Sequence, residues 1–358
     1  MRPLIVPFFI SLLGCPHQCI FCDQRKIAGR GELPSAGELL DRIAAFRASG
    51  RGRPVEVAFY GGTFTALPEA LMTRLLLPLQ PLLAAGEIHS IRLSTRPDAV
   101  DPSIARFLAG MGVKTVELGA QSMDDDVLAF AGRGHGASHT IEANRILKEA
   151  GVAVGMQLMP GLPGDSEEKA LESLGRVLEL RPAFLRIYPA LVIAGTRLAE
   201  LHEAVEYTPL SLDGAIRLCK IMLHGALAAR VRVIRIGLQA TAELEQAGTV
   251  LAGPYHPAFR QLVEAELFYD LLRKMAEGMP RVGRVSVRCS PERVSDVTGQ
   301  RRGNLRRLHR EAGVTVDRVL ADRSVSSLEI AVEYGGEMRK GNIVHDLDYA
   351  TKEVPLGR

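Results

Sequence analysis

Residues 4–22 read LIVPFFISLLGCPHQCIFC. The run from Leu4 to Leu13 is almost wholly apolar, which predicts a buried first strand. A short loop follows it at once and holds Cys15, Cys19 and Cys22, with three and two residues between successive cysteines. Thiolates this close in the chain can converge on one metal centre. We therefore expect a first strand that leads directly into a metal-binding loop.

The number of cysteines limits what this loop can bind. A closed structural zinc site and a four-cysteine ferredoxin cluster each require four donors, and the loop supplies three. A 4Fe–4S cluster held by three thiolates keeps one iron open, so a cofactor with an amine and a carboxylate can chelate it. The alternatives are a zinc site completed by His17 or by a distant donor, and a chance grouping of cysteines.

Beyond the loop, residues up to about 239 alternate short apolar or β-branched runs with longer segments of helical period. Repeated strand–helix units of this kind predict an α/β fold around a parallel sheet. The expected strands are Leu4–Leu13, Val55–Tyr60, Ile88–Ser94, Val113–Gly119, Val152–Met159, Phe184–Tyr188 and Val231–Ile236. The expected helices include Ala36–Ala48, Pro68–Ala84, Pro102–Gly110, Ser138–Ala150 and Glu167–Leu180, with caps at Ser35, Asp101 and Ser166.

Residues of unusual type gather where these strands end. In a parallel α/β barrel the loops after the strands share one mouth, where such barrels hold their active sites. Such loops also collect glycine, proline and polar residues for structural reasons alone, but here six loops agree. They are Cys15–Cys22, Gly61–Phe64, Thr95–Asp98, Gln121–Ser122, Pro160–Gly164 and Pro189–Thr196.

The pattern changes after about residue 240. A helix at Pro257–Glu277, a basic helix at Gln300–Ala312 and short strands predict a separate α+β module, so we expect domains at 1–240 and 241–358. The expected strands of the module are Val285–Arg288, Val314–Val319 and Ser327–Tyr334. Nine arginines lie between residues 281 and 310, against two acidic residues. Arginine clusters neutralise phosphates, although most charge runs are solvated helix faces.

The composition excludes several classes of protein. A net charge of +3 on 358 residues argues against a protein dedicated to coating nucleic acid or an anionic membrane. No stretch approaches the roughly 20 apolar residues of a membrane helix, and the N-terminal run lacks the charged leader of a secretion signal, so we expect a cytoplasmic protein. Five cysteines make no disulfide framework, and Cys219 and Cys289 are expected to be ordinary buried residues.

The order and spacing of these motifs resemble a known family. Cys-x-x-x-Cys-x-aromatic-Cys after a first strand is similar to the defining motif of the radical S-adenosylmethionine (SAM) superfamily. Residues 1 to about 240 resemble the radical SAM half of the Elongator catalytic subunit and, more distantly, oxygen-independent coproporphyrinogen III oxidase. The motifs that carry this resemblance are GCPH (14–17), FYGGTF (59–64), STRPD (94–98), VELGAQS (116–122), RGH (133–135), QLMPGLPG (157–164) and YPALVIAGT (188–196).

The resemblance implies a partial (β/α)6 TIM-like barrel with two cofactors. It places a 4Fe–4S cluster on the three loop cysteines and SAM against residues at the strand ends. The implied SAM contacts are Gly61, Gly62, Thr63, Ser94, Gln121, Arg133 and Gln157. A serine at position 94 departs from the family pattern, because both relatives have a glutamate there.

Other polar residues of the same motifs have less certain roles. Arg96 and Asp98 either contribute to the site or form a pair inside their own turn. His135 and Tyr188 are candidates for substrate contact or a radical relay, although such residues are more often packed and hydrogen-bonded. The sequence assigns no catalytic residue beyond the cofactor contacts.

The resemblance also implies a function. It predicts an enzyme that reductively cleaves SAM to a 5'-deoxyadenosyl radical, which abstracts hydrogen from a substrate, with a base of tRNA favoured by analogy. The alternatives are a small-molecule or tetrapyrrole-like substrate and, from another class, a non-catalytic metal-binding or electron-transfer protein. The expected electron donor is of the flavodoxin or ferredoxin type. Residues 241–358 resemble no acetyltransferase domain, so acetyl-CoA is not expected as a ligand.

Overall fold

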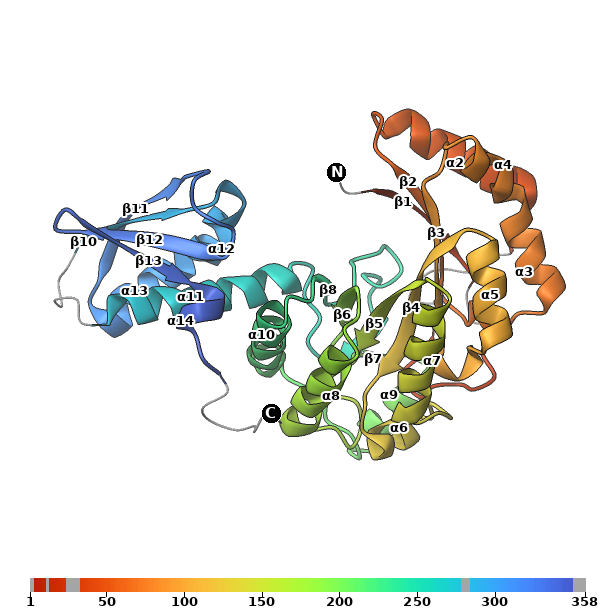
Figure 1. Cartoon of the computed structure of the whole chain (residues 1–358). Coiled ribbons are helices and arrows are strands. Elements are labelled where there is room, and N and C mark those ends of the chain that lie inside the picture. The colour runs from red at the N-terminus through yellow and green to blue at the C-terminus, as the bar shows by residue number, and fades with distance from the viewer. Residues whose placement is uncertain (1–2, 11–12, 24–32, 278–283, 350–358) are drawn as a thin grey trace. The chain divides into compact units, whose positions relative to one another are not determined.

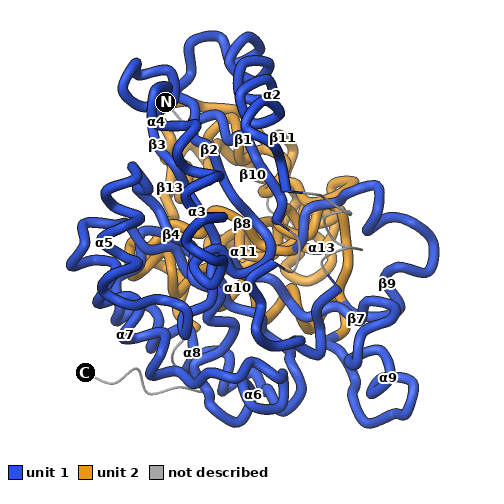
Figure 2. Tube along the Cα trace, turned by 90° about the vertical axis from the view of Figure 1, so that its right-hand side faces the viewer, with its two compact units in different colours: residues 1–210, 238–253 blue, residues 211–237, 254–358 orange. Residues whose placement is uncertain are grey.

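A computed structural model gives the fold of the chain (Figure 1). It describes residues 3–10, 13–23, 33–277 and 284–349. The chain forms two compact units: residues 1–210 with 238–253, and residues 211–237 with 254–358 (Figure 2). Each unit consists of two separate segments of the chain, whereas the predicted domains meet at a single boundary near residue 240. The helix at 212–228 groups with the second unit, and the later segment 238–253 groups with the first.

A seven-stranded sheet organises the first part of the chain, in the order β1-β2-β3-β4-β5-β6-β8. All neighbours from β1 to β6 are parallel, which confirms the predicted α/β fold. Its strands are β1 (Leu4–Phe9), β2 (Val55–Tyr60), β3 (Ser90–Thr95), β4 (Val113–Gln121), β5 (Ala153–Leu158), β6 (Phe184–Ile187) and β8 (Val233–Ile236). The first strand is shorter than predicted, and part of the predicted range, residues 11 and 12, lies outside the described residues. Strand β4 runs two residues further than predicted, to Gln121.

Side-chain contacts reveal that this sheet is curled. Strands β2 and β6 are four steps apart in the sheet, which in a flat sheet is about 19 Å. Nevertheless, an Arg186 Nη2 on β6 donates to the hydroxyl of Tyr60 on β2 at 3.2 Å. Only a sheet rolled toward a barrel brings these side chains together, so the predicted partial barrel is confirmed.

Helices follow the strands and pack on the sheet (Figure 1). The predicted caps at Ser35, Asp101 and Ser166 are present, because each side chain accepts a hydrogen bond from an early backbone N–H of its helix. The predicted helix Pro68–Ala84 is wrong as a single element, because Pro78 and Pro81 divide it. The helices of this unit are α2 (Ala36–Ser49), α3 (Glu69–Leu76), α4 (Gln80–Ala84), α5 (Pro102–Gly110), α6 (Asp125–Phe130), α7 (Ala137–Glu149), α8 (Glu167–Glu179) and α9 (Arg197–Glu203). A small antiparallel pair, β7 (Val192–Ile193) and β9 (Val250–Ala252), completes it.

A buried charge network crosses the sheet beneath the strand ends. Arg92 lies between Glu56 and Glu117, with N···O distances of 2.7 and 2.9 Å. Glu117 also pairs with Arg186, whose Nε lies 2.6 Å from Glu117 Oε2. A buried ion is costly unless its partners compensate for lost water, so Glu117 holds two guanidiniums in place.

Replacing Glu117 with glutamine should destabilise the first unit strongly. The side chain keeps its shape but leaves Arg186 without its carboxylate partner, and breaking a buried pair costs about 3 kcal/mol or more. For a unit of this size the melting temperature should fall by roughly 6 to 12 °C. The control is Glu142→Gln, which removes half-exposed ion pairing to Arg145 on α7 and should shift the melting temperature by about 2 °C or less. Equal shifts in the two variants would contradict a structural role for Glu117.

The second unit contains a four-stranded sheet in the order β11-β10-β12-β13. Its strands are β10 (Arg284–Cys289), β11 (Thr315–Ala321), β12 (Glu329–Tyr334) and β13 (Glu337–Asn342), and its helices are α10 (Leu212–Ala228), α11 (Phe259–Ala276), α12 (Val294–Thr298), α13 (Gly303–Ala312) and α14 (Ile343–Asp346). Strand β13 was not predicted. Gly335 and Gly336, both at positive φ, form the turn that leads into it, and its exposed Met-Arg-Lys run lacks the apolar signal of a buried strand.

In the part of the chain that the structure describes, no helix combines the length and the apolar character that crossing a membrane requires.

Candidate functional site

The cysteine loop interlocks with the turn that follows β2. Thr63 N donates to Leu13 O at 2.8 Å, and Cys15 Sγ lies 3.3 Å from Thr63 Oγ1. Glycine is required on both sides of this contact. A Cβ on Gly14 would lie 2.3 Å from Thr63 O, and a Cβ on Gly62 would lie 2.4 Å from Leu13 O. Both glycines also have positive φ, so the predicted Gly-Gly-Thr turn packs directly against the cysteine loop.

The other side of the loop is held by segments far along the chain. Ile20 N donates to Ala131 O at 3.1 Å, and Leu198 N donates to Ile20 O at 2.8 Å. Cys19 and Phe21 belong to a buried apolar cluster whose other members include Val127, Ala131, Leu162, Val192, Leu198 and Tyr207. The second half of the loop is therefore packed against apolar side chains, whereas Pro16, His17 and Gln18 are exposed.

Two arginines direct their guanidinium groups at Cys19. Arg133 Nη1 lies 3.1 Å from Cys19 Sγ, and Arg96 Nη1 lies 4.0 Å from the same sulfur. Arg96 is also paired with both carboxylate oxygens of Asp98, at 2.9 and 2.8 Å, and donates to the carbonyl of Arg133. The expected Arg96–Asp98 pair is thus present. The additional contact of Arg96 with Cys19 was not predicted, although the position of Arg96 in a loop after a strand indicated that it could reach the site.

The ends of β4 and β5 carry the two predicted glutamines side by side. Gln157 Nε2 donates to Gln121 Oε1 at 3.0 Å. Gln121 ends β4 in the left-handed region, with φ of 69°, which a residue other than glycine rarely adopts. Arg133 Nη2 donates to Gly119 O at 2.6 Å on the same strand. One guanidinium therefore spans the distance from the cysteine loop to the end of β4.

The remaining predicted residues lie nearby in the fold but are not all joined to this group. Ser94 is half-buried beside Glu117 in the sheet register, and within the described residues its hydroxyl bonds to none of the other candidates. Gly61, like Gly62, has positive φ in the turn after β2. Tyr188 accepts a hydrogen bond from Arg186 Nη1 at 2.9 Å, which ties it to the buried charge network.

His135 is buried between cationic side chains. Burial and the nearby guanidinium of Arg133 lower the pKa of His135 to about 4, although Asp98 acts in the opposite direction. Its Nδ1 has no hydrogen-bond partner among the described residues. The ring is therefore neutral at pH 7, which suits a packed residue.

Stability of the first unit should consequently fall as the pH is lowered. The unfolded chain takes up the His135 proton near pH 6.5, whereas the folded chain resists it until about pH 4, so stability is lost over that window. His135→Gln should reduce the fall in melting temperature between pH 7 and pH 5. The exposed His89 supplies the control, since His89→Gln should retain the full fall. Equal pH dependence in both variants would show that His135 does not titrate in this way.

Comparison with known proteins identifies the class. The model of the radical SAM superfamily matches residues 9–177, and the model of the radical SAM C-terminal domain matches residues 182–269. The chain therefore belongs to the radical SAM superfamily, and it is an enzyme whose cofactors are a 4Fe–4S cluster and SAM.

The relatives are Elongator-like. The tRNA uridine(34) acetyltransferase of Methanocaldococcus jannaschii is 36% identical, over 60% of this chain and 47% of that protein. Elongator complex protein 3 of Mus musculus is 32% identical, over 46% of this chain and 34% of that protein. The solved structure of Elp3 from Methanocaldococcus infernus covers 92% of this chain and 74% of that one, with a TM-score of 0.57 and 21% identity, and so supports the fold. The chain spans about half the length of the tRNA uridine(34) acetyltransferases that it matches.

The donor set of the cysteine loop fits a 4Fe–4S cluster. Burial, with the neighbouring thiols of Cys19 and Cys15, raises the pKa of Cys22 to about 12, so without metal this group is a neutral thiol. Among the described residues, no three His, Cys, Asp or Glu side chains are placed to hold a metal ion. The donors of a single metal ion must converge on one point. The three cysteines of a 4Fe–4S cluster each bind a different iron, so they need not converge in this way. Cys19 and Cys22 lie against apolar side chains, and the guanidinium N–H groups aimed at Cys19 would offset the negative charge of a thiolate-bound cluster.

Proposed function

We propose that this radical SAM enzyme acts on RNA and that its substrate is a base of tRNA. The observation that carries the proposal is the similarity of its radical SAM region to tRNA uridine(34) acetyltransferases, at up to 36% identity. We infer an electron donor of the flavodoxin or ferredoxin type and a cytoplasmic location, where tRNA is available.

We assign the cluster to Cys15, Cys19 and Cys22. One-electron reductive cleavage of SAM to methionine and a 5'-deoxyadenosyl radical is the chemistry that such a cluster supplies in this superfamily. The chain's own part is to hold and shield the site. The apolar cluster around Cys19 and Phe21 excludes water from it. Arg133 and Arg96 place positive charge beside the Cys19 sulfur, which would offset the negative charge of a thiolate-bound cluster.

We assign SAM binding to the turn after β2 and to the ends of β3, β4 and β5. The residues are Gly61, Gly62, Thr63, Ser94, Gln121, Arg133 and Gln157. Glycines at positive φ leave their backbone open to close approach by a ligand. The Gln121 and Gln157 amides present donors and acceptors for hydroxyl groups, and a guanidinium such as that of Arg133 can hold a carboxylate. The backbone strain at Gln121 supports this assignment, because strained conformations cluster at functional sites.

The test measures SAM cleavage and its dependence on RNA. The protein is purified without oxygen, its cluster is reconstituted, and SAM is added with dithionite and with or without unfractionated tRNA. We expect 5'-deoxyadenosine to form, and a new modified nucleoside to appear in digests of the tRNA. No 5'-deoxyadenosine from protein with an intact cluster would contradict the assigned chemistry. Product formation with tRNA left unchanged would overturn the RNA substrate and favour a small molecule.

A further inference from the structure

Positive charge is concentrated in the second unit. That unit contains 23 lysines and arginines against 16 aspartates and glutamates, a formal charge of +7, whereas the whole chain carries +3. The first unit is therefore net acidic. A charge difference of this size directs a polyanion to the second unit.

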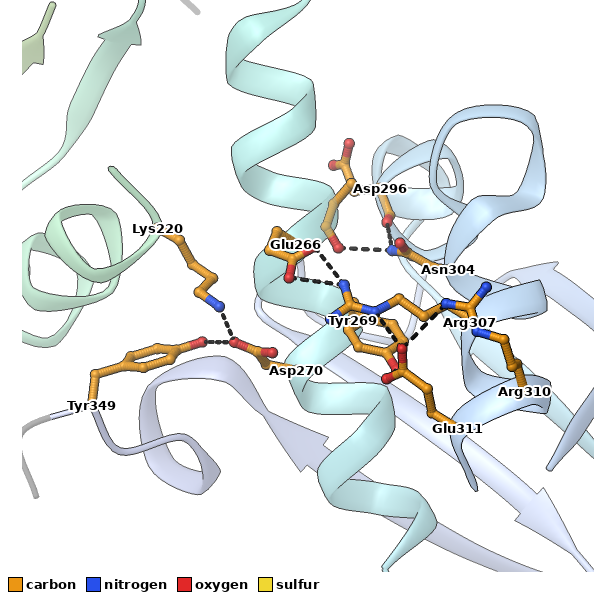
Figure 3. A network of polar contacts seen from close by, with 11 residues as sticks. Lys220, Glu266, Tyr269, Asp270, Asp296, Asn304, Arg307, Arg310, Glu311 and Tyr349 are labelled. Carbon is orange, nitrogen blue, oxygen red and sulfur yellow. Dashed lines mark hydrogen bonds and ion pairs between the residues drawn. The ribbon is translucent and has the colours of Figure 1, made fainter. Parts of the chain in front are cut away.

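Some arginines of this unit are held by the fold. Arg307 Nη1 lies 2.9 and 3.0 Å from the two oxygens of Glu266, and its Nε lies 3.1 Å from Glu311 (Figure 3). Its guanidinium also stacks on the ring of Tyr269, 3.8 Å from the centroid. Arg293 is bound in the same way, to Glu264 and Asp296. These two arginines have their charge neutralised by neighbours.

Four other arginines are exposed and form what we call the arginine stripe: Arg301, Arg302, Arg306, which donates to the carbonyl of Arg301, and Arg310. Arg306 and Arg310 are four residues apart on α13 and so share one helix face, and Arg301 and Arg302 lie directly before the helix. The side chain of Arg310 is 73% exposed, and its only carboxylate contact among the described residues is Glu311 at 3.3 Å, which already pairs with Arg307. Within the described residues, Arg301, Arg302 and Arg306 form no ion pair.

The fold fixes the start of the stripe. The buried Asn304 amide donates to Ala265 O at 2.7 Å and to Asp296 O at 3.1 Å, which anchors the first turn of α13. Arg301 and Arg302 precede it with φ of 49° and 60°, in the left-handed region. Like charges four residues apart on a helix also repel. A bound polyanion would relieve this repulsion.

We propose that the arginine stripe binds the phosphate backbone of the RNA substrate. This rests on the proposed function and adds the surface that holds the substrate. From residue 303 to 310 the helix rises about 10 Å, so the stripe can face more than one phosphate of one strand. Guanidiniums bind phosphate oxygens in bidentate pairs, so exposed arginines suit this partner. Arg307 is adjacent in sequence but is not part of the stripe, because its guanidinium is paired with Glu266 and Glu311.

The experiment compares two variants of the cluster-loaded protein. The stripe variant is Arg301→Gly, Arg302→Gly, Arg306→Ala and Arg310→Ala, with glycine chosen where φ is positive. The matched control replaces four other exposed arginines of the same unit, Arg284, Arg318, Arg323 and Arg339, with alanine. Both lose four positive charges. Binding of labelled unfractionated tRNA is measured by fluorescence anisotropy from 50 to 200 mM salt.

We expect the stripe variant to bind tRNA at least about tenfold more weakly at 50 mM salt, with the slope of log Kd against log salt shallower by roughly 3 to 4. The control should keep its affinity within about threefold. Equal losses in both variants, no loss in the stripe variant, or no tRNA binding by the unsubstituted protein would each overturn the proposal. So would binding to anionic phospholipid vesicles without binding to tRNA.

Two further measurements separate the possible failures. If the stripe variant melts early, Arg306→Ala with Arg310→Ala alone is used, because alanine at exposed helix positions does not oppose folding. That pair should still weaken tRNA binding, and unchanged binding overturns the proposal. Formation of 5'-deoxyadenosine by the unsubstituted protein tests the proposed function separately, so loss of that chemistry is not confused with loss of RNA binding.

Discussion

Replacing Cys19 with alanine is expected to abolish the 4Fe–4S cluster and the formation of 5'-deoxyadenosine. Cys19 is the most buried of the three loop cysteines, and two guanidiniums are directed at its sulfur. The two remaining cysteines are too few to hold the cluster. The substitution also removes the sulfur that Arg133 and Arg96 contact. Iron content and visible absorbance after anaerobic reconstitution measure the cluster, and chromatography measures the nucleoside. The amount of product should fall by about 100-fold or more, because the loss of a metal ligand has a larger effect than the loss of a residue that only contacts a ligand.

The matched control is Cys219→Ala. Cys219 is a fully buried thiol on α10, and burial raises its pKa well above the ordinary value, so it behaves as a small apolar residue. Its variant should retain cluster and activity. Retention of a full cluster in Cys19→Ala would contradict our assignment of the loop, as would cluster loss in Cys219→Ala.

Replacing Gly62 with alanine is expected to separate the cysteine loop from the turn after β2. The new Cβ would lie 2.4 Å from Leu13 O and 2.6 Å from Ile10 O, and φ of 59° disfavours any side chain. Strain and overlap together cost about 2 to 4 kcal/mol. The melting temperature should fall by roughly 5 to 15 °C, and cluster incorporation should fall with it.

The variant Gly86→Ala separates the effect of backbone strain from the effect of steric overlap. Gly86 also has positive φ, 68°, but a Cβ there meets no atom of the described residues within 4 Å. This control should lower the melting temperature by only a few degrees, for about 1 kcal/mol of backbone strain, and should leave the cluster intact. If both variants lost the cluster equally, close packing of the loop against the turn would not be the reason for the effect.

Local features of the fold were predictable from the sequence. Strand–helix alternation, the caps at Ser35, Asp101 and Ser166, and the placement of cysteines after the first strand depend on neighbours in the chain. These are signals that single residues and short periods carry. The number of cysteine ligands alone did not decide between a 4Fe–4S cluster and a zinc site. The family resemblance then indicated a 4Fe–4S cluster and SAM as the cofactors.

Long-range convergence was not predictable in the same way. That Arg96 reaches Cys19 depends on how two loops 77 residues apart pack, and no local period encodes this. Arg307 was grouped in sequence with its neighbours, but the Glu266 that neutralises it lies on another helix. Strand β13 was missed because an exposed edge strand does not need apolar residues.

The position of Arg133 has a consequence for how the two cofactors bind. Its guanidinium contacts the sulfur of Cys19 and also the carbonyl of Gly119, which lies near the end of β4, where we propose that SAM binds. A residue shared by two ligand sites couples their equilibria, and thermodynamic linkage makes that coupling reciprocal. Under the assignments proposed above, the factor by which the loaded cluster changes the affinity for SAM equals the factor by which bound SAM changes the affinity of the loop for the cluster. If the loaded cluster tightens SAM binding, SAM occupancy would then stabilise the metal centre by the same factor.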